Sequence, residues 1–170
     1  CRFSYANLWE AKAMDENSKP KYSVSLIIPK SDTKTIEKVK AAIQAAYDEG
    51  KSKLSNGKSV PSLNSIKTPL RNGDIDRPDY EAYANSYFIN ANSIIAPGIV
   101  DADRQPILEH SEIYSGIYGR ASITFYAFNT KTSRGIACGL QNVQKLRDGE
   151  PLGGHSSAEE DFADDEDFLN

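Results

Sequence analysis

The stretch YSGIYGRASITFYAFN, residues 114–129, is the longest strand signal in the chain. Side chains of a β-strand point alternately to its two faces. One face of this strand carries the small and apolar residues that a core requires: Ile117, Gly119, Ala121, Ile123, Phe125 and Ala127. The opposite face carries aromatic rings, a guanidinium and hydroxyl groups: Tyr114, Tyr118, Arg120, Ser122, Thr124, Tyr126 and Phe128. The function of the protein depends on what this second face contacts.

Further strands are predicted from alternating or apolar-rich runs that turn residues interrupt. They cover residues 2–10, 21–28, 81–95 and 134–143, with short strand and turn material at residues 99–108. In the first of these strands, strict alternation predicts that Phe3 and Leu8 lie on opposite faces.

One helix is predicted, at residues 32–49. Ser31 or Asp32 can accept hydrogen bonds from the free N–H groups of its first turn, and Gly50 is a natural stop. Apolar residues at helical spacing form a single stripe: Ile36, Val39, Ile43, Ala46 and Tyr47. We expect this helix to pack on a sheet or to plug the end of a barrel.

Short strands around a single helix, without a βαβ rhythm, predict a mainly β protein built as a small antiparallel barrel or sandwich. Residues 51–79 are rich in Gly, Ser, Asn, Lys and Pro. Loops of this length in a compact domain tend to be functional or mobile. We predict a long basic insertion that closes over a ligand, with a solvated surface loop as the alternative.

The charge of the chain is distributed unevenly. The formal net charge is −4, yet seven of the 24 acids lie in residues 159–170, where there is no base. The rest of the chain holds 17 acids against 20 bases. A mildly basic body therefore carries an acidic tail, and the split says more about partners than the overall acidity does.

Several classes of protein are excluded or disfavoured by composition. A length of 170 residues suits one domain with appendages and a sizeable core. There is no run of 18 apolar residues, so no membrane span is expected, and no secretory signal is visible. The two cysteines, Cys1 and Cys138, are too few for a disulfide framework, which makes a reduced intracellular compartment the default.

Catalytic signals are weak. His110 has no histidine or cysteine at zinc-ligand spacing, and His155 lies in a glycine-rich linker. Gly57-Lys58-Ser59 lacks the upstream glycine of a phosphate-binding loop, and Pro61 blocks the helix that should follow. Two groups of carboxylates could instead hold magnesium in a nuclease: Asp74, Asp76, Asp79 and Glu81, or Asp101 and Asp103. Ordinary turns explain the same residues, since Asn72-Gly73-Asp74 and Pro78-Asp79 are common turn sequences.

The aromatic residues are the stronger signal. Tyr114, Tyr118 and Tyr126 either fill a second small core or form a platform for a ligand. A second core would not favour Arg120, Ser122 and Thr124 in the same row, which favours the platform. Rings that stack bases beside cations that neutralise phosphates bind single-stranded nucleic acid without sequence preference.

The acidic tail also contains the apolar residues Phe162, Phe168 and Leu169. Apolar side chains among acids, beyond a flexible linker, are typical of a peptide that docks into a basic, apolar-lined pocket of a partner. The residues expected to bind such a partner are Asp164, Asp165, Glu166, Asp167 and Phe168. Alternatively, the tail competes with nucleic acid for the protein's own groove, or it serves solubility alone.

Seven segments together resemble a family of phage and prophage proteins: ANLWEAKA, YSVSLIIPK, KTPLRNGD, YANSYFINANS, PGIVDADRQPIL, SEIYSGIYGRASITFYAFN and GIACGLQNVQKLRDGEPLGG. This family, long catalogued as a domain of unknown function, was later assigned to the single-stranded-DNA-binding proteins with an oligonucleotide/oligosaccharide-binding (OB) fold. The resemblance extends from about Phe3 to Phe162. In bacterial proteins of this kind, the acidic tail ends on an aromatic residue. Here the last residues are Phe168-Leu169-Asn170, so the aromatic residue is not the terminal one.

The resemblance implies a five-stranded OB-type barrel with one helix, and a non-catalytic role in phage replication or recombination in the host bacterial cytoplasm. The DNA-binding domain is expected at residues 1–147, and composition predicts a Gly/Ser-rich linker at 148–158 and the acidic tail at 159–170. The expected partner is single-stranded DNA, with phage replication or recombination proteins reached through the tail. No cofactor and no membrane contact are expected, and the protein is expected to be a monomer or a dimer.

The predicted DNA contacts rest on alternation and charge. Base stacking is assigned to Tyr118, Tyr126 and Tyr114, with Tyr5, Trp9 and Tyr87 as further candidates. Phosphate contacts are assigned to Arg120, Lys131, Arg134, Lys67, Arg71 and Arg77, with weaker support for Lys12 and Lys21. A magnesium-dependent nuclease acting on phage or host DNA is the alternative function.

Overall fold

The computed structural model describes residues 1–13 and 15–152. In this described part of the chain, seven strands form one sheet: β1 (Arg2–Lys12), β2 (Lys21–Pro29), β3 (Leu70–Asn72), β4 (Ser86–Ser93), β5 (Gly98–Val100), β6 (Tyr118–Asn129) and β7 (Arg134–Arg147). Three α-helices accompany them: α1 (Thr33–Glu49), α2 (Lys51–Ser55) and α3 (Gly73–Asp76). There are also three single turns of 3₁₀-helix: η1 (Leu63–Ser65), η2 (Glu81–Tyr83) and η3 (His110–Glu112).

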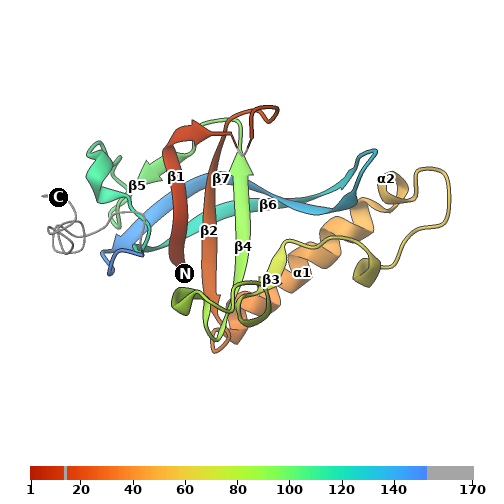
Figure 1. Ribbon diagram of the computed structural model, residues 1–170, viewed down its shortest axis with the longest axis horizontal. Helices are drawn as coiled ribbons and strands as arrows, with labels where there is room; N and C mark the ends of the chain where they lie inside the picture. The colour runs from red at the N-terminus through yellow and green to blue at the C-terminus, as the bar shows by residue number, and fades with distance from the viewer. Residues whose placement is uncertain (14, 153–170) are drawn as a thin grey trace, which may run out of the picture.

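Five of the strands close into a ring of hydrogen bonds in the order β1, β2, β4, β7, β6 and back to β1. The β1–β6 contact is made where Arg2 pairs with Tyr118, and β4 joins β7 in parallel where Asn92 pairs with Gly139. The short strands β3 and β5 lie outside the ring. A mainly β fold is therefore confirmed, and Figure 1 shows β6 and β7 crossing behind β1, β2 and β4.

The prediction of five strands and one helix was incomplete. Strands β3 and β5 have three residues each, and helices α2 and α3 have five and four. Elements this short complete too few periods for an apolar pattern to become visible. The insertion at residues 51–79 is consequently built from α2, η1, β3 and α3.

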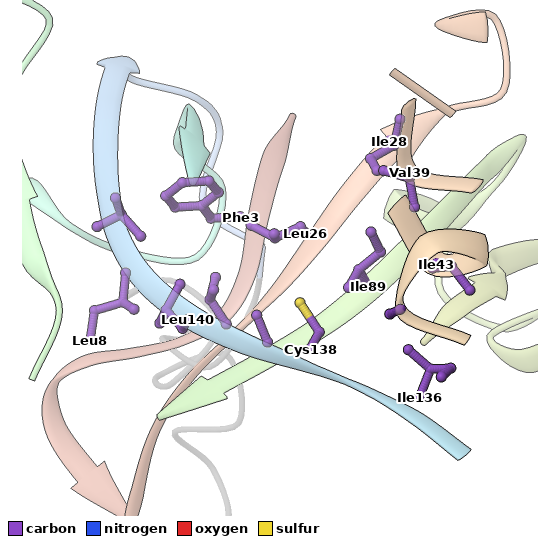
Figure 2. Packing of buried hydrophobic residues seen from close by; sticks show 14 of the residues in the cluster. Phe3, Leu8, Leu26, Ile28, Val39, Ile43, Ile89, Ile136, Cys138 and Leu140 are labelled. Carbon is purple, nitrogen blue, oxygen red and sulfur yellow. The ribbon is translucent and has the colours of Figure 1, made fainter. Parts of the chain in front are cut away.

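The core lies inside the ring and beneath α1. Ile36, Val39, Ile43 and Ala46 of the helix are buried, as the apolar stripe predicted. They join one cluster with strand residues that include Ile28, Ile89, Ile136, Cys138 and Leu140. Figure 2 shows Val39 and Ile43 on the helix facing the strands that carry these residues. None of the helices among the described residues is long and apolar enough to span a membrane.

Strand β1 departs from strict alternation. Ser4 pairs with Ser25 while Asn7 pairs with Ser23, so β1 contains one more residue than β2 between these pairs. Tyr5 lies in this bulge with a φ of 46°, in the left-handed region. The bulge reverses the alternation, and Phe3 and Leu8 are both buried. The prediction that they lie on opposite faces was wrong for this reason.

Strand β6 keeps its alternation throughout. Arg120, Ser122, Thr124 and Tyr126 are exposed, and the intervening residues are buried or half-buried. The pairing of β6 with β7 shifts register between Tyr118 and Gly119 and again between Ser122 and Ile123. At both places the extra residue belongs to β7, so β6 itself is not interrupted. The strand begins at Tyr118, so Tyr114 precedes it instead of extending it.

Candidate nucleic-acid interface

The guanidinium of Arg77 is surrounded by four aromatic rings. Its central carbon lies 5.6 Å from the ring centre of Tyr5, 6.0 Å from Tyr80, 5.7 Å from Tyr83 and 5.4 Å from Phe88. We call these five residues the Arg77 cluster. Among the described residues, no carboxylate lies within ion-pair distance of Arg77. The rings hold the cation in place by cation–π attraction and leave its charge available for an external anion.

Two of the four rings form the fixed floor of the cluster. The Tyr83 hydroxyl hydrogen-bonds with the Ser25 hydroxyl at 3.0 Å, and the Tyr83 ring packs edge-on against Phe88 with centroids 5.0 Å apart. Both residues are buried. Tyr83 reaches this position because η2 precedes β4, where a continuous strand from residue 81 was predicted.

The other two rings are available to a ligand. Tyr5 is 49% exposed and Tyr80 is 50% exposed, although each contacts Arg77. The β1 bulge places Tyr5 here, and hydrogen bonding with the Tyr80 hydroxyl, followed by burial, raises the pKa of the Tyr5 phenol. Two half-exposed rings beside one another provide stacking faces for bases.

Cavities adjoin the cluster. One of about 450 Å³ is lined by Arg71, Arg77, Phe88 and Asn90, with Thr68, Pro69 and Asp76. A larger one of about 800 Å³ is lined by Tyr5, Tyr80 and Tyr83 together with Lys12, Tyr114 and Leu152. Asn90 pairs with Ser25 on β2, and Arg71 pairs with Phe88 across β3 and β4. We call the two cavities and the cluster the Arg77 groove; it follows the outer face of β1, β2 and β4.

Of the predicted residues, Tyr5, Arg71 and Arg77 come together in this groove. Arg71 donates to Asp76 at 2.7 Å, and half of the Arg71 side chain remains exposed. An exposed ion pair of this kind contributes little to stability, so a phosphate can replace the carboxylate at low cost.

Tyr118 and Tyr114 lie near the start of β6 and are held by the end of β7. The Tyr118 ring lies under two guanidiniums, 4.0 Å from that of Arg147 and 5.3 Å from that of Arg2. The Tyr114 hydroxyl donates to the Gly149 carbonyl at 2.9 Å and accepts from the Gly149 N–H at 3.2 Å. These contacts fix the chain after β7, and Tyr114 still reaches the larger cavity.

Arg120 and Tyr126 occupy the outer face of β6, on the other wall of the ring. The Arg120 Nε donates to the Gln144 side chain at 2.7 Å. Tyr126 is 48% exposed, and a Cβ added at Gly139 on β7 would lie 3.6 Å from its ring. The structure therefore does not bring this row together with the Arg77 groove on one face (Figure 1).

Lys67, Lys131 and Arg134 gather where the β6–β7 turn meets the insertion. The Lys67 N–H donates to the Arg134 carbonyl at 3.3 Å, and the Arg134 guanidinium donates to the Leu54 carbonyl at 3.2 Å. Lys131 lies in the turn itself and is exposed. Figure 1 shows this hairpin beside α2.

Trp9 and Tyr87 already contact residues of the protein. The Trp9 ring stacks on His110 at a centroid distance of 4.3 Å, and its N–H donates to the His110 carbonyl. Tyr87 packs against the core, with the ammonium groups of Lys30 and Lys40 at 5.4 and 5.8 Å from its ring. Both remain weaker candidates for stacking a base.

The carboxylates proposed for magnesium form turns and ion pairs. Asp74 accepts from Lys30 and from the Asn85 N–H, and these bonds lower the pKa of the Asp74 carboxyl. Asp101 accepts from the N–H groups of Asp103 and Gln105. Within residues 1–13 and 15–152, no group of three or more His, Cys, Asp or Glu side chains is placed to hold a metal ion.

Sequence reasoning missed Tyr80, Tyr83, Phe88 and Asn90. A signal was present, because Arg77 is followed by tyrosines three and six residues later, an interleaving of basic and aromatic residues. It was obscured by the assignment of Tyr83 to a strand.

Comparisons with known proteins find chains of similar fold. The chain is similar to the structure of the single-stranded DNA-binding protein from bacteriophage Enc34 in complex with ssDNA, with 25% identity, a TM-score of 0.74 and coverage of 89% of this chain and 85% of that one. In fold it also resembles gp2.5, a single-stranded DNA-binding protein encoded by bacteriophage T7, with 17% identity, a TM-score of 0.56 and coverage of 95% and 87%.

A curated relative supports the same grouping. The putative protein p50 of Acyrthosiphon pisum secondary endosymbiont phage 1 is 30% identical over 170 residues, which span 96% of this chain and 89% of that protein. The family described as "Enterobacter phage Enc34, ssDNA-binding protein" matches residues 1–169. These matches confirm the predicted family resemblance and the choice of a binding protein over an enzyme. The chain belongs to this family of phage single-stranded-DNA-binding proteins.

Proposed function

We propose that this protein binds single-stranded DNA without sequence preference in the Arg77 groove, and that it coats transient single strands during phage replication or recombination. The observation that carries the proposal is the Arg77 cluster. It combines a cation that has no carboxylate partner among the described residues with two half-exposed rings. The Enc34 protein has been solved in complex with ssDNA, which supports the same ligand here.

The groove matches the two parts of a nucleotide. Tyr5 and Tyr80 would stack bases, and each stacked base contributes about 1–3 kcal/mol. Arg77 and Arg71 would contact phosphates, which releases counterions and makes the affinity depend on salt. Asn90 on the sheet is exposed and would offer its side-chain amide to any base, whereas Ser25 beside it is buried and bonded to Tyr83.

We infer an OB-type barrel from the ring and from the helix α1 that covers it. In such barrels, the face of the second and third strands and the loops between strands 1–2 and 4–5 bind oligonucleotides. Here the second and third strands of the ring in chain order are β2 and β4, whose outer face carries the Arg77 groove. The two loops lie between β1 and β2, near Lys12 and Lys21, and between β6 and β7, at Lys131. Arg134 and Lys67 would extend the phosphate contacts from that second loop.

The remaining predicted contacts would form a secondary path. Tyr118, Arg120 and Tyr126 would guide DNA around the other wall of the ring, with Tyr114 at the junction between the two walls. Trp9 and Tyr87 would add stacking faces only after releasing their present contacts.

The linker beyond Leu152 and the acidic tail at residues 159–170 lie outside the described residues. We keep the proposal that the tail either docks a replication or recombination partner or competes with DNA for the groove. Its support is the position of Leu152, which lines the larger cavity together with Tyr5 and Tyr80 and donates its N–H to the Ser115 carbonyl at 2.9 Å. The proposal includes the division of the chain into a binding domain that ends at residue 147, a linker that ends at residue 158 and the tail. It also includes the host cytoplasm as the place where the protein acts.

Fluorescence anisotropy with labelled oligo-dT tests the function directly. Saturable binding that weakens as salt rises is expected. The absence of binding to oligo-dT, even at low salt, would overturn the proposal. Labelled DNA incubated with Mg²⁺ should stay intact, and cleavage that disappears with EDTA would favour the nuclease instead.

A further inference from the structure

A third cavity lies at one end of the molecule, beside the larger cavity of the Arg77 groove: Asp148 lines it and accepts a hydrogen bond from Tyr114, which lines that larger cavity. It has a volume of about 560 Å³ and lies between the segment that follows β5 and the end of β7. Its apolar residues include Ile107, Leu108 and Leu146, of which Leu108 is 85% exposed and Leu146 is 48% exposed. Exposed apolar side chains inside a charged rim are typical of a protein-binding surface.

The rim of this groove is acidic. Five carboxylates line it against two basic side chains, Lys145 and Arg147. Lys145 is neutralised by Glu112 at 2.9 Å and Asp148 at 2.6 Å, and Arg147 lies over the Tyr118 ring. Asp103 and Glu109 are exposed and form no ion pair with the described residues. The surface, which we call the acidic groove, therefore repels DNA and attracts a cationic protein surface.

The opposite end of the folded molecule carries such a cationic surface. Residues 51–63 contain three basic residues, Lys51, Lys53 and Lys58, and no acid. Lys53 and Lys58 are exposed there, and so is Val60, at 45%. Figure 1 shows α2 and the β6–β7 turn at one end of the long axis, with β5 at the other. We call residues 51–63 the basic end.

We propose that the acidic groove of one protomer receives the basic end of a second copy, so that protomers associate head to tail along single-stranded DNA. Such a contact joins two different surfaces and does not close on itself, so it can continue along a strand. Opposite charges would orient the approach, and Leu108 and Leu146 would receive Val60 as the apolar part of the contact. The inference rests on the proposed function, since the DNA aligns the copies.

Charge reversal tests the contact without touching the Arg77 groove. One variant carries Asp103→Lys and Glu109→Lys, and the other carries Lys53→Glu and Lys58→Glu. The control, Lys34→Glu with Lys38→Glu on exposed positions of α1, changes the net charge by the same amount as the second variant. Binding is measured on a dT strand of about ten nucleotides, which suits one protomer, and on long poly-dT, where cooperativity appears.

We expect each charge-reversed variant to lose cooperativity on poly-dT by about tenfold or more, while binding to the short strand and the behaviour of the control change little. A 1:1 mixture of the two variants should recover cooperativity, because alternating copies restore opposite charges at every contact. Wild-type cooperativity in both variants, or no recovery in the mixture, would overturn the head-to-tail contact. Failure of the wild type to bind the short strand would instead count against the proposed function.

Discussion

The Arg77 guanidinium lies 5.6 Å from the centre of the Tyr5 ring, although Tyr5 belongs to β1 and Arg77 follows α3 in the insertion. The contact depends on two local features. The bulge in β1 holds Tyr5 at a φ of 46°, and Arg77 caps the C-terminus of α3, where its N–H donates to the Gly73 carbonyl. The contact between Arg77 and Tyr5 thus holds the insertion against the outer face of the sheet, along the Arg77 groove.

Removing the exposed rings should weaken DNA binding. Tyr80→Ala and Tyr5→Ala should each reduce the affinity for oligo-dT by about 5- to 150-fold, because each base loses roughly 1–3 kcal/mol of stacking. Tyr80→Phe keeps the ring and should bind nearly as well as the wild type. Anisotropy titrations compare the variants, and an unchanged affinity in Tyr80→Ala would exclude Tyr80 as a stacking residue.

Arg77 should act through its charge and its planar shape. Arg77→Ala should weaken binding to all sequences and reduce the slope of log affinity against log salt by about one, as expected for one lost phosphate contact. Arg77→Lys should restore the slope and only part of the affinity, because an ammonium cannot pack among rings as a guanidinium does. A salt slope that stays at the wild-type value in Arg77→Ala would rule out a phosphate contact.

Two substitutions of Tyr5 should differ in their effect on stability but not in their effect on DNA binding. A side chain in the left-handed region costs of order 1 kcal/mol, a cost that glycine avoids. Tyr5→Gly should therefore be more stable than Tyr5→Ala by about that amount, although both lose the ring and should bind DNA equally poorly. Urea denaturation gives the stability. Equal stability of the two variants would show that the bulge is not strained at this residue.

Asp148 should make stability depend on pH in the acidic range. Its hydrogen bond with Lys145, and then that with Tyr114, lower the pKa of the Asp148 carboxyl below its ordinary value. Because the pKa is lower in the folded state, the contribution to stability is present above the unfolded pKa of about 3.9 and disappears as pH falls below it. The Tm of the wild type should therefore fall more steeply than that of Asp148→Asn over the range of roughly pH 5 to 2 that surrounds this pKa. Parallel Tm profiles would contradict this role of Asp148.

The sequence predicted the elements with long, regular patterns. Twelve residues of unbroken alternation identified β6, and the stripe from Ile36 to Ala46 identified α1. The β1 bulge could not be predicted, because nothing in the residue types around Tyr5 marks its positive φ. The burial of both Phe3 and Leu8, against the predicted alternation, follows from that single backbone conformation at Tyr5.

The candidate site was predicted only in part, for a different reason. Tyr5, Arg71 and Arg77 were named individually, but their meeting depends on how the insertion folds back over β4. Tyr118 and Tyr126 received more weight because alternation reveals which face of a strand a residue occupies. It does not reveal which wall of a closed ring that face belongs to, and the structure places the Arg77 groove on the other wall.

Photo-crosslinking tests the central claim most directly. Oligonucleotides in which bromodeoxyuridine replaces thymidine are irradiated on the full chain, and the crosslinked peptides are identified by mass spectrometry. We predict crosslinks at Tyr5 and Tyr80 of the Arg77 groove. Crosslinks confined to Tyr118 and Tyr126, on the other wall of the ring, would contradict it.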